Sequence, residues 1–250
     1  MRDTVKHNLS ESQFITQFPA ALSAGCLVTL DAEESQHAVK VFRHRTGDIL
    51  RLGDGCGIQA QGILRQASAD ACQLEITDFS TLEERPRVHL AIAALKDNDL
   101  EEVMDSCGQL ALASMTLLRT AHSQEPRDSD LKRTLRRLEL KSRVAFKQSL
   151  KPWITTVQGP FHFADWQRTQ KAQVVLCDLD GNVQLEDSLR LDASRELVLA
   201  VGPEGGFSPE EIQTLKSAGA ALLGLGQTRL RAKTCPIVAL GALLGMGLAT

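Results

Sequence analysis

A glycine-rich loop that joins an apolar segment to a helix start is the strongest constraint on how this 250-residue chain can fold. Residues 202–206 read Gly-Pro-Glu-Gly-Gly, and the apolar run 197–201 before them is typical of a buried strand in a parallel sheet. After the loop, Ser208, Pro209 and Glu211 supply an N-cap, a first-turn proline and the acidic member of a capping box. The pattern therefore places backbone groups without side chains at the carboxyl end of a strand, where open α/β sheets bind ligands.

The composition of this loop restricts the ligand. Neither the GxxxxGK[ST] nor the GxGxxG spacing occurs in it, and the carboxylate of Glu204 would repel a phosphate group. We therefore expect a ligand without phosphate that is bound mainly through backbone groups. A tight strand-to-helix turn that binds nothing is the alternative interpretation.

A second segment of the same kind lies closer to the carboxyl terminus. Residues 221–226 predict another short strand, and residues 227–236 predict a loop that carries Arg229 and Arg231. A helix rich in small residues is expected from residue 237 to about residue 248. The two loops together predict a single ligand site at one edge of a sheet.

The two motifs, GPEGGFSPEEI and LGxxRLRxxT, resemble those of the uracil-N3-specific 16S ribosomal RNA methyltransferases, a family of the knotted SPOUT superfamily. Weaker similarity at residues 37–48, 53–55 and 148–152 extends the resemblance over most of the chain. The resemblance implies an α/β fold, in which a knotted, mostly parallel sheet domain is preceded by a small PUA-like β-barrel that binds RNA. It also implies a homodimer that acts on 16S ribosomal RNA of the small subunit, rather than on DNA or at a membrane.

The resemblance further implies S-adenosylmethionine as the methyl donor, bound in a deep knot formed by the last three strand–loop–helix units. The residues that would hold its adenine and ribose are Gly202, Pro203, Glu204, Gly205, Gly206, Leu223, Leu225, Gly226 and Leu230. Arg231 and Arg229 become candidate catalytic residues, because a guanidinium can stabilise the negative charge that develops on uracil carbonyls. A carboxylate partner at a dimer interface is the alternative role for these arginines.

Some residues depart from the family pattern. Lys233 stands where the family usually has Glu, and Cys235 stands where it has Ala. In the helix after the first strand of the α/β domain, Ser106 and Gln109 replace the Lys and Glu of a Lys-x-x-Glu-Leu-Gly motif. A base in place of an acid is expected to reverse the local field, so two functions stay open: an active uridine-N3 methyltransferase, or a relative that binds cofactor and RNA with lost or altered catalysis or a different RNA target. A small-molecule enzyme is disfavoured by the basic helix and the amino-terminal β domain described below.

Composition indicates an ordinary soluble, cytoplasmic globular protein, with 43% apolar and 24% charged residues. Apolar runs fall short of the roughly 18 residues that a membrane helix needs, and the first twenty residues lack the apolar core of a signal peptide. The six cysteines show no zinc-ligand spacing, so we expect reduced thiols and no metal site.

Hydrophobic patterning divides the chain into two predicted domains, 1–84 and 85–250. Alternation between residues 48 and 78 predicts a three-strand β-meander, and Glu83–Pro86 reads as a linker. The rest alternates strands with helices, which indicates a mostly parallel sheet with helices on both faces. The predicted strands are 88–95, 115–118, 153–157 and 173–177, and the predicted helices are 100–112, 129–149 and 163–168.

The charge pattern indicates where RNA binds. Residues 132–151 contain eight Lys or Arg and one acid, Glu139, in a chain of net charge −3. The basic positions fall on one half of the predicted 129–149 helix, which favours a phosphate backbone as partner over a merely solvated face. The RNA-binding candidates are Arg133, Arg137 and Lys141 on this helix and Arg43 and Arg45 in the amino-terminal domain.

Overall fold

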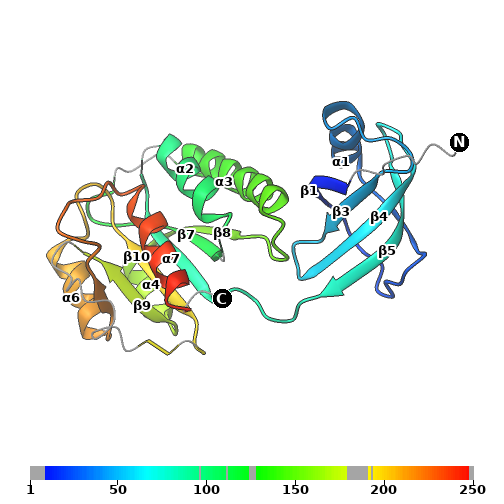
Figure 1. Ribbon diagram of the computed structural model, residues 1–250. Helices are drawn as coiled ribbons and strands as arrows, with labels where there is room; N and C mark the ends of the chain where they lie inside the picture. Colours follow the sequence, from blue (N-terminus) through cyan, green and yellow to red (C-terminus); the bar gives the residue numbers. More distant parts are fainter. Residues whose placement is uncertain are drawn as a thin grey trace, which may run out of the picture. The chain divides into compact units, whose positions relative to one another are not determined.

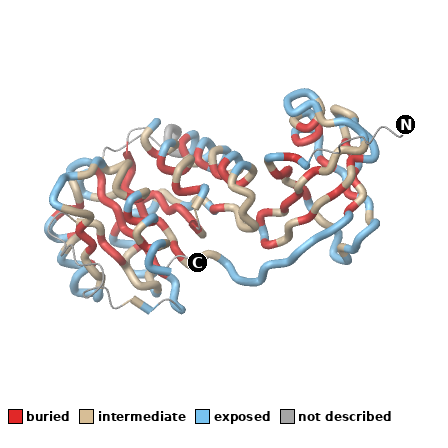
Figure 2. The backbone as a smooth tube through the Cα atoms, viewed as in Figure 1, coloured by how far each residue is buried: buried red, intermediate tan, exposed pale blue. Residues whose placement is uncertain are grey.

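The computed structural model describes residues 9–95, 97–110, 112–123, 128–178, 191, 192 and 194–247. The chain forms two compact units. The first contains residues 1–85 and 146–154, and the second contains residues 86–145 and 155–250. The break after residue 85 lies in the exposed segment between the strands of the two units (Figure 2). Segment 146–154, which the sequence division placed in the second domain, belongs to the first unit.

The first unit is built on a five-stranded sheet with the order β1-β3-β4-β5-β2. Figure 1 labels β1, β3, β4 and β5 of this sheet. Its strands are β1 (Leu9–Ile15), β2 (Leu27–Thr29), β3 (Ile49–Gly53), β4 (Ile58–Gln66) and β5 (Gln73–Thr81). The predicted meander is confirmed as the antiparallel set β3, β4 and β5. Sequence patterning did not predict β1, which pairs in parallel with β3, or the three-residue β2.

A helical turn packs on this sheet and holds the returning segment 146–154. Helix α1 (Ala32–Gln36), capped by Asp31, runs on into the π-helical turn η1 (His37–Val41). The buried carboxylate of Glu34 accepts hydrogen bonds from Lys147 Nζ at 2.9 Å and from the Ile15 amide at 3.3 Å. Lys147 Nζ also lies 3.0 Å from His37 Nδ1. His37 therefore has a structural role within this unit.

The second unit contains a six-stranded sheet in which every pairing is parallel, so the predicted mostly parallel sheet is confirmed. The strand order is β11-β9-β10-β6-β7-β8. The strands are β6 (Val88–Ala93), β7 (Leu112–Arg119), β8 (Thr156–His162), β9 (Gln173–Cys177), β10 (Leu197–Val201) and β11 (Ala221–Leu223). The predicted start of the strand at 153–157 is wrong, because β8 begins at Thr156. Trp153 pairs instead with Cys56 of the first unit, and the Ile154 amide donates to the Gly55 carbonyl.

Helices cover both faces of this sheet, as alternate residues of β10 show. Leu197, Leu199 and Val201 pack in one cluster with helices α2 (Asp97–Cys107), α3 (Asp128–Ser149) and α7 (Cys235–Gly245). Val198 and Ala200 pack in another with α4 (Phe163–Thr169) and α6 (Pro209–Ser217). This three-layer order fits the fully apolar β10, because a parallel strand covered on both faces has no solvent side.

Two helices end earlier than the sequence predicted. The helix expected to continue to residue 112 ends at Cys107, and a Cβ added at Gly108 would lie 2.4 Å from the carbonyl oxygen of Met104. The helix expected to reach about residue 248 ends at Gly245, and Gly247 follows with a positive φ of 70°. Both ends show glycine terminating a helix at its carboxyl end. Among the described residues, every helix is too short or too polar to cross a membrane.

Candidate functional site

Three neighbouring strands of the second unit, β9, β10 and β11, end at one edge of the sheet, and the segments after them enclose a cavity of about 660 Å³. Cys177 and Asp178 line it from the end of β9, residues 201–207 from β10, and residues between 223 and 235 from β11. A cavity at the carboxyl edge of a parallel sheet is the usual ligand position in α/β proteins. The two loops singled out in the sequence therefore face one cavity.

Local bonds fix the glycine loop after β10. The predicted capping box is present, with Ser208 accepting from the Glu211 amide and the Glu211 carboxylate accepting from the Ser208 amide. The second carboxylate oxygen of Glu211 accepts from the Ala121 amide at 2.9 Å, which ties the loop to the end of β7. A Cβ at Gly202 would lie 2.8 Å from the Phe207 amide nitrogen, so backbone packing requires glycine there.

His122 contacts the same loop from the segment after β7. Its Nδ1 lies 3.1 Å from the carbonyl oxygen of Gly206, and a Cβ added at Gly205 would lie 3.4 Å from the His122 Cβ. A methyl group at Gly205 would therefore be in van der Waals contact with His122. Gly206, with φ of 74°, adopts the left-handed conformation that favours glycine.

Every predicted cofactor-binding residue lines this cavity, as do both candidate catalytic arginines. Sequence reasoning missed Asp99, Cys177 and Asp178. Strand β9 was predicted, but its place next to both β10 and β11 was not, so the contribution of its end could not be foreseen. Asp99 comes from α2, whose charged residues had no predicted partner.

The two candidate arginines differ in what they bind. An Nη of Arg229 donates to the carbonyl oxygen of Glu204 at 2.8 Å and so joins the loop after β11 to the loop after β10. The exposed Arg231 guanidinium has no hydrogen-bond or ion-pair partner in the part of the chain that the structure describes. Arg231 is therefore available to an incoming group, while Arg229 is engaged within the protein.

Lys233, the residue expected to reverse the local field, is neutralised within the protein. Its Nζ donates to Asp99 Oδ1 at 2.9 Å and to Glu102 Oε2 at 2.8 Å. Hydrogen bonds to Glu102 and Asp99 raise the pKa of Lys233 above its ordinary value. With two carboxylates around one ammonium, the expectation of a reversed field is wrong.

Two thiols that line the cavity, those of Cys177 and Cys235, contact each other. Cys235 is the first residue of α7, two residues before the start expected from the sequence, and Cys177 ends β9. The hydrogen bond to Cys235, together with burial, raises the pKa of Cys177 well above its ordinary value. The same bond lowers the pKa of Cys235, although the sequence indicated no neighbour that would act on this thiol.

Comparison with known proteins identifies the family. Residues 83–244 match the RNA methyltransferase domain, and residues 30–77 match the RNA methyltransferase PUA domain. The chain is 31% identical over 228 residues to ribosomal RNA small subunit methyltransferase E of Mycobacterium bovis, covering 87% of this chain and 86% of that protein. The chain belongs to the ribosomal RNA small subunit methyltransferase E family.

Other members of this family are similar over comparable lengths. The Synechocystis protein of the same name is 28% identical, over 85% of this chain and 71% of that protein. Among solved structures, a family member from Neisseria gonorrhoeae bound to S-adenosyl methionine superposes with a TM-score of 0.83 over 94% of this chain and 97% of that one. At 21% identity, this likeness supports the fold.

In this family member, the long helix α3 carries most of the predicted RNA-binding residues. Its inner face is buried as expected, with Leu138, Ala145 and Phe146 inaccessible to solvent. Arg133 and Arg137 are exposed and Lys141 is half-buried, while Arg137 also lies 3.4 Å from Glu101.

The outer surface of α3 is less uniformly basic than the sequence suggested. Leu140 and Val144 are exposed on it, and Lys147 points inward to Glu34. The side chain of Leu131, expected on the inner face, lies outside the described residues. The exposed basic residues are therefore concentrated before residue 138.

The first unit presents the remaining RNA-binding candidates. Arg43 and Arg45 are exposed, and Arg43 has a positive φ of 58°, which is unusual for a residue with a side chain. Asp48 orders this turn, because its carboxylate accepts from the Arg45 amide at 2.9 Å and lies 3.3 Å from His44 Nδ1. The turn thus holds two cationic side chains in solvent.

Proposed function

We propose that this protein transfers a methyl group from S-adenosylmethionine to N3 of a uridine in 16S ribosomal RNA. The observation that carries the proposal is the cavity at the ends of β9, β10 and β11, where backbone groups line the wall beside Arg231, whose guanidinium has no partner among the residues that the structure describes. Membership of the family supports the reaction class. RNA is the partner that the exposed basic residues of α3 favour.

The residues of the cavity fit S-adenosylmethionine. The volume of about 660 Å³ suits a ligand of its size. Leu223, Leu225 and Leu230 supply an apolar wall for adenine, while the glycine loop supplies backbone donors and acceptors for a ligand without phosphate. Carboxylates at Asp178 and Glu204 suit a cofactor with positive ammonium and sulfonium groups.

When bound, the cofactor would supply an electrophilic methyl carbon. The loops after β10 and β11 would hold it in line with the uracil nitrogen, and such alignment is worth roughly 7–11 kcal/mol of the barrier. N3 of uracil loses its proton as it becomes a nucleophile, so negative charge spreads onto the neighbouring carbonyl oxygens. The Arg231 guanidinium, which lines the cavity, would stabilise that charge.

The alternative of a relative without catalysis rested on Lys233. Because Asp99 and Glu102 neutralise this lysine, its presence no longer argues for a changed field at the substrate. The proposal therefore keeps the active enzyme as the function.

The decisive experiment combines binding and activity. Calorimetry should detect S-adenosylmethionine binding to the purified protein, and mass mapping should locate a new methyl group on a uridine of small-subunit RNA that lacks the modification. Leu225→Ala should weaken cofactor binding roughly tenfold, because Leu225 packs at the cavity wall. The control Leu222→Ala truncates the same side chain on the opposite face of the sheet and should leave affinity unchanged. Unmodified RNA with wild-type protein, or equal affinity of the two variants, would refute the proposal.

We also propose that the sheet domain is knotted, that the first unit is a closed PUA-like barrel and that the protein acts in the cytoplasm, as the family resemblance implies. Packing of α7 back against β10 and α2 is consistent with a chain that returns through its own fold.

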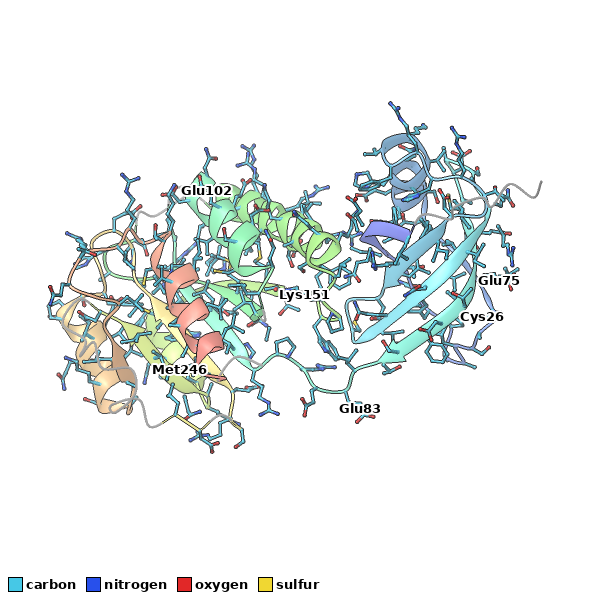
Figure 3. The ribbon with its side chains drawn as sticks, in the orientation of Figure 1. Cys26, Glu75, Glu83, Glu102, Lys151 and Met246 are labelled. Carbon is cyan, nitrogen blue, oxygen red and sulfur yellow. The ribbon has the colours of Figure 1, made fainter. Side chains whose placement is uncertain are left out.

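A homodimer is also proposed. Val238 on α7 is exposed, as is Met246, which follows the helix and is labelled in Figure 3. Added side chains at Gly241 and Gly245 would meet open space, so another helix could approach closely. A monomer in light scattering at micromolar concentration would refute the dimer.

A further inference from the structure

A single lysine connects the cavity loop to a helix far away in sequence. Lys233 lies 134 positions from Asp99 and 131 from Glu102, and it binds both carboxylates. The two acids are three residues apart on α2, so they lie on the same side of that helix. Figure 3 shows Glu102 on this helix.

The lysine is placed where its anchoring affects the reactive part of the loop. It follows Arg231 by two residues, and after Thr234 helix α7 begins. Asp99 and Lys233 both line the cavity, so their ion pair forms part of its wall. At the other end of the loop, Arg229 is bonded to Glu204, so Arg231 lies between two fixed points.

A contribution to overall stability does not explain this arrangement. The three side chains keep 27%, 31% and 59% of their surface exposed for Lys233, Asp99 and Glu102, and exposed ion pairs contribute little to stability. Direct binding of an RNA phosphate by Lys233 is also disfavoured, because the phosphate would have to displace two carboxylates. Restriction of the loop is the effect that remains.

We propose that Lys233, held by Asp99 and Glu102, is a positioning residue that fixes the loop after β11 against α2 and so places Arg231 for methyl transfer. This inference rests on the proposed function. It assigns the departure from the family pattern at residue 233 to an ion pair within the protein, and Lys233 itself touches no reacting atom.

A double-mutant cycle tests the positioning role. Lys233→Ala should lower kcat about tenfold with little change in KM for RNA, because the ground-state contacts persist while the arginine is misplaced. In an Arg231→Ala background the same change should cost almost nothing further, and Lys233→Arg should restore most of the activity. Lys216→Ala on α6, an exposed lysine outside the cavity, is the matched control. Additive losses, or a raised KM with unchanged kcat, would overturn the proposal.

Thiol labelling tests the anchoring without relying on activity. Cys235 lies two residues after Lys233 and lines the cavity, while the exposed Cys56 belongs to the first unit and serves as an internal reference. Lys233→Ala should raise the rate of iodoacetamide labelling at Cys235 several-fold relative to Cys56, and Lys216→Ala should not. Equal ratios in wild type and Lys233→Ala would refute the anchoring. Faster labelling in a protein that methylates no RNA would refute the proposed function and preserve the anchor.

Discussion

The guanidinium of Arg229 donates a hydrogen bond to the backbone carbonyl of Glu204 at 2.8 Å, and this bond joins the two loops that line the cavity. Arg231, two residues later, makes no such bond among the described residues. Two arginines in one motif therefore have separable roles, although the sequence analysis named both as catalytic candidates.

Separate measurements of binding and transfer should distinguish the two arginines. Arg229→Ala should weaken S-adenosylmethionine binding roughly tenfold, because it removes a charge-assisted hydrogen bond, worth about 1.4 kcal/mol here, that holds the cofactor loop. Arg231→Ala should leave that affinity nearly intact and slow methyl transfer at least tenfold, about 1.4 kcal/mol of barrier. Calorimetry and single-turnover methylation measure the two quantities. The reverse pattern, with Arg231→Ala losing the cofactor, would contradict the assignment.

The exposed basic residues of α3 should contribute to RNA affinity in a salt-dependent way. Arg133→Glu with Arg136→Glu should weaken binding to ribosomal RNA of any sequence and flatten the dependence of log K on log salt, since each phosphate contact releases condensed counterions. Filter binding at several salt concentrations measures both effects. Lys216→Glu with Lys171→Glu, two exposed lysines outside α3, is the control of equal charge. An identical slope for the two double variants would show that α3 is only a solvated face.

The ion pair between Lys147 and Glu34 should matter to the folding of the first unit. Glu34 is 1% exposed and Lys147 13%, so Lys147→Met leaves a buried carboxylate unpaired, at a cost of about 3–5 kcal/mol. Lys147→Met with Glu34→Gln should recover much of this loss. Trp153 lies in the first unit and Trp166 in the second, so urea unfolding followed by fluorescence in a Trp166→Phe background reports on the first unit. A double variant as unstable as the single variant would contradict this account.

Local signals account for what the sequence predicted correctly. The strand at 197–201 and the capping box at Ser208 depend on neighbours within a few positions, and both appear in the structure as expected. Because both predicted loops follow parallel strands, their convergence on one cavity also followed from the fold class.

The remaining features depend on contacts between distant positions. Lys233 was expected to reverse the local field because its partners, Asp99 and Glu102, lie on a helix that is distant in sequence. Segment 146–154 belongs to the first unit because Gln13, 133 positions from Phe146, donates to the Phe146 carbonyl and, in the same unit, to that of Lys151. Neither periodicity nor charge pattern encodes such pairings, so the sequence left them undetermined.

A half-buried histidine, His89, should make the stability of the second unit depend on pH. Burial lowers the pKa of His89 below its ordinary value of 6.5, against an opposing effect of Glu196, and Nδ1 of the ring lies 2.7 Å from Ser114 Oγ. The unfolded chain therefore binds a proton at this residue at a higher pH than the folded chain does. As pH falls through 6.5 and below, the unfolded state gains protons first and the free energy of unfolding decreases.

The variant His89→Asn tests this prediction, because it keeps a polar group near Ser114 and removes the titration. The melting temperature of wild type should fall more steeply than that of the variant between about pH 7.5 and 5.5, by a few degrees. Other histidines, including His44 beside Asp48, are common to both proteins, so the difference isolates His89. Parallel curves over this range would show that His89 titrates alike in the folded and unfolded states.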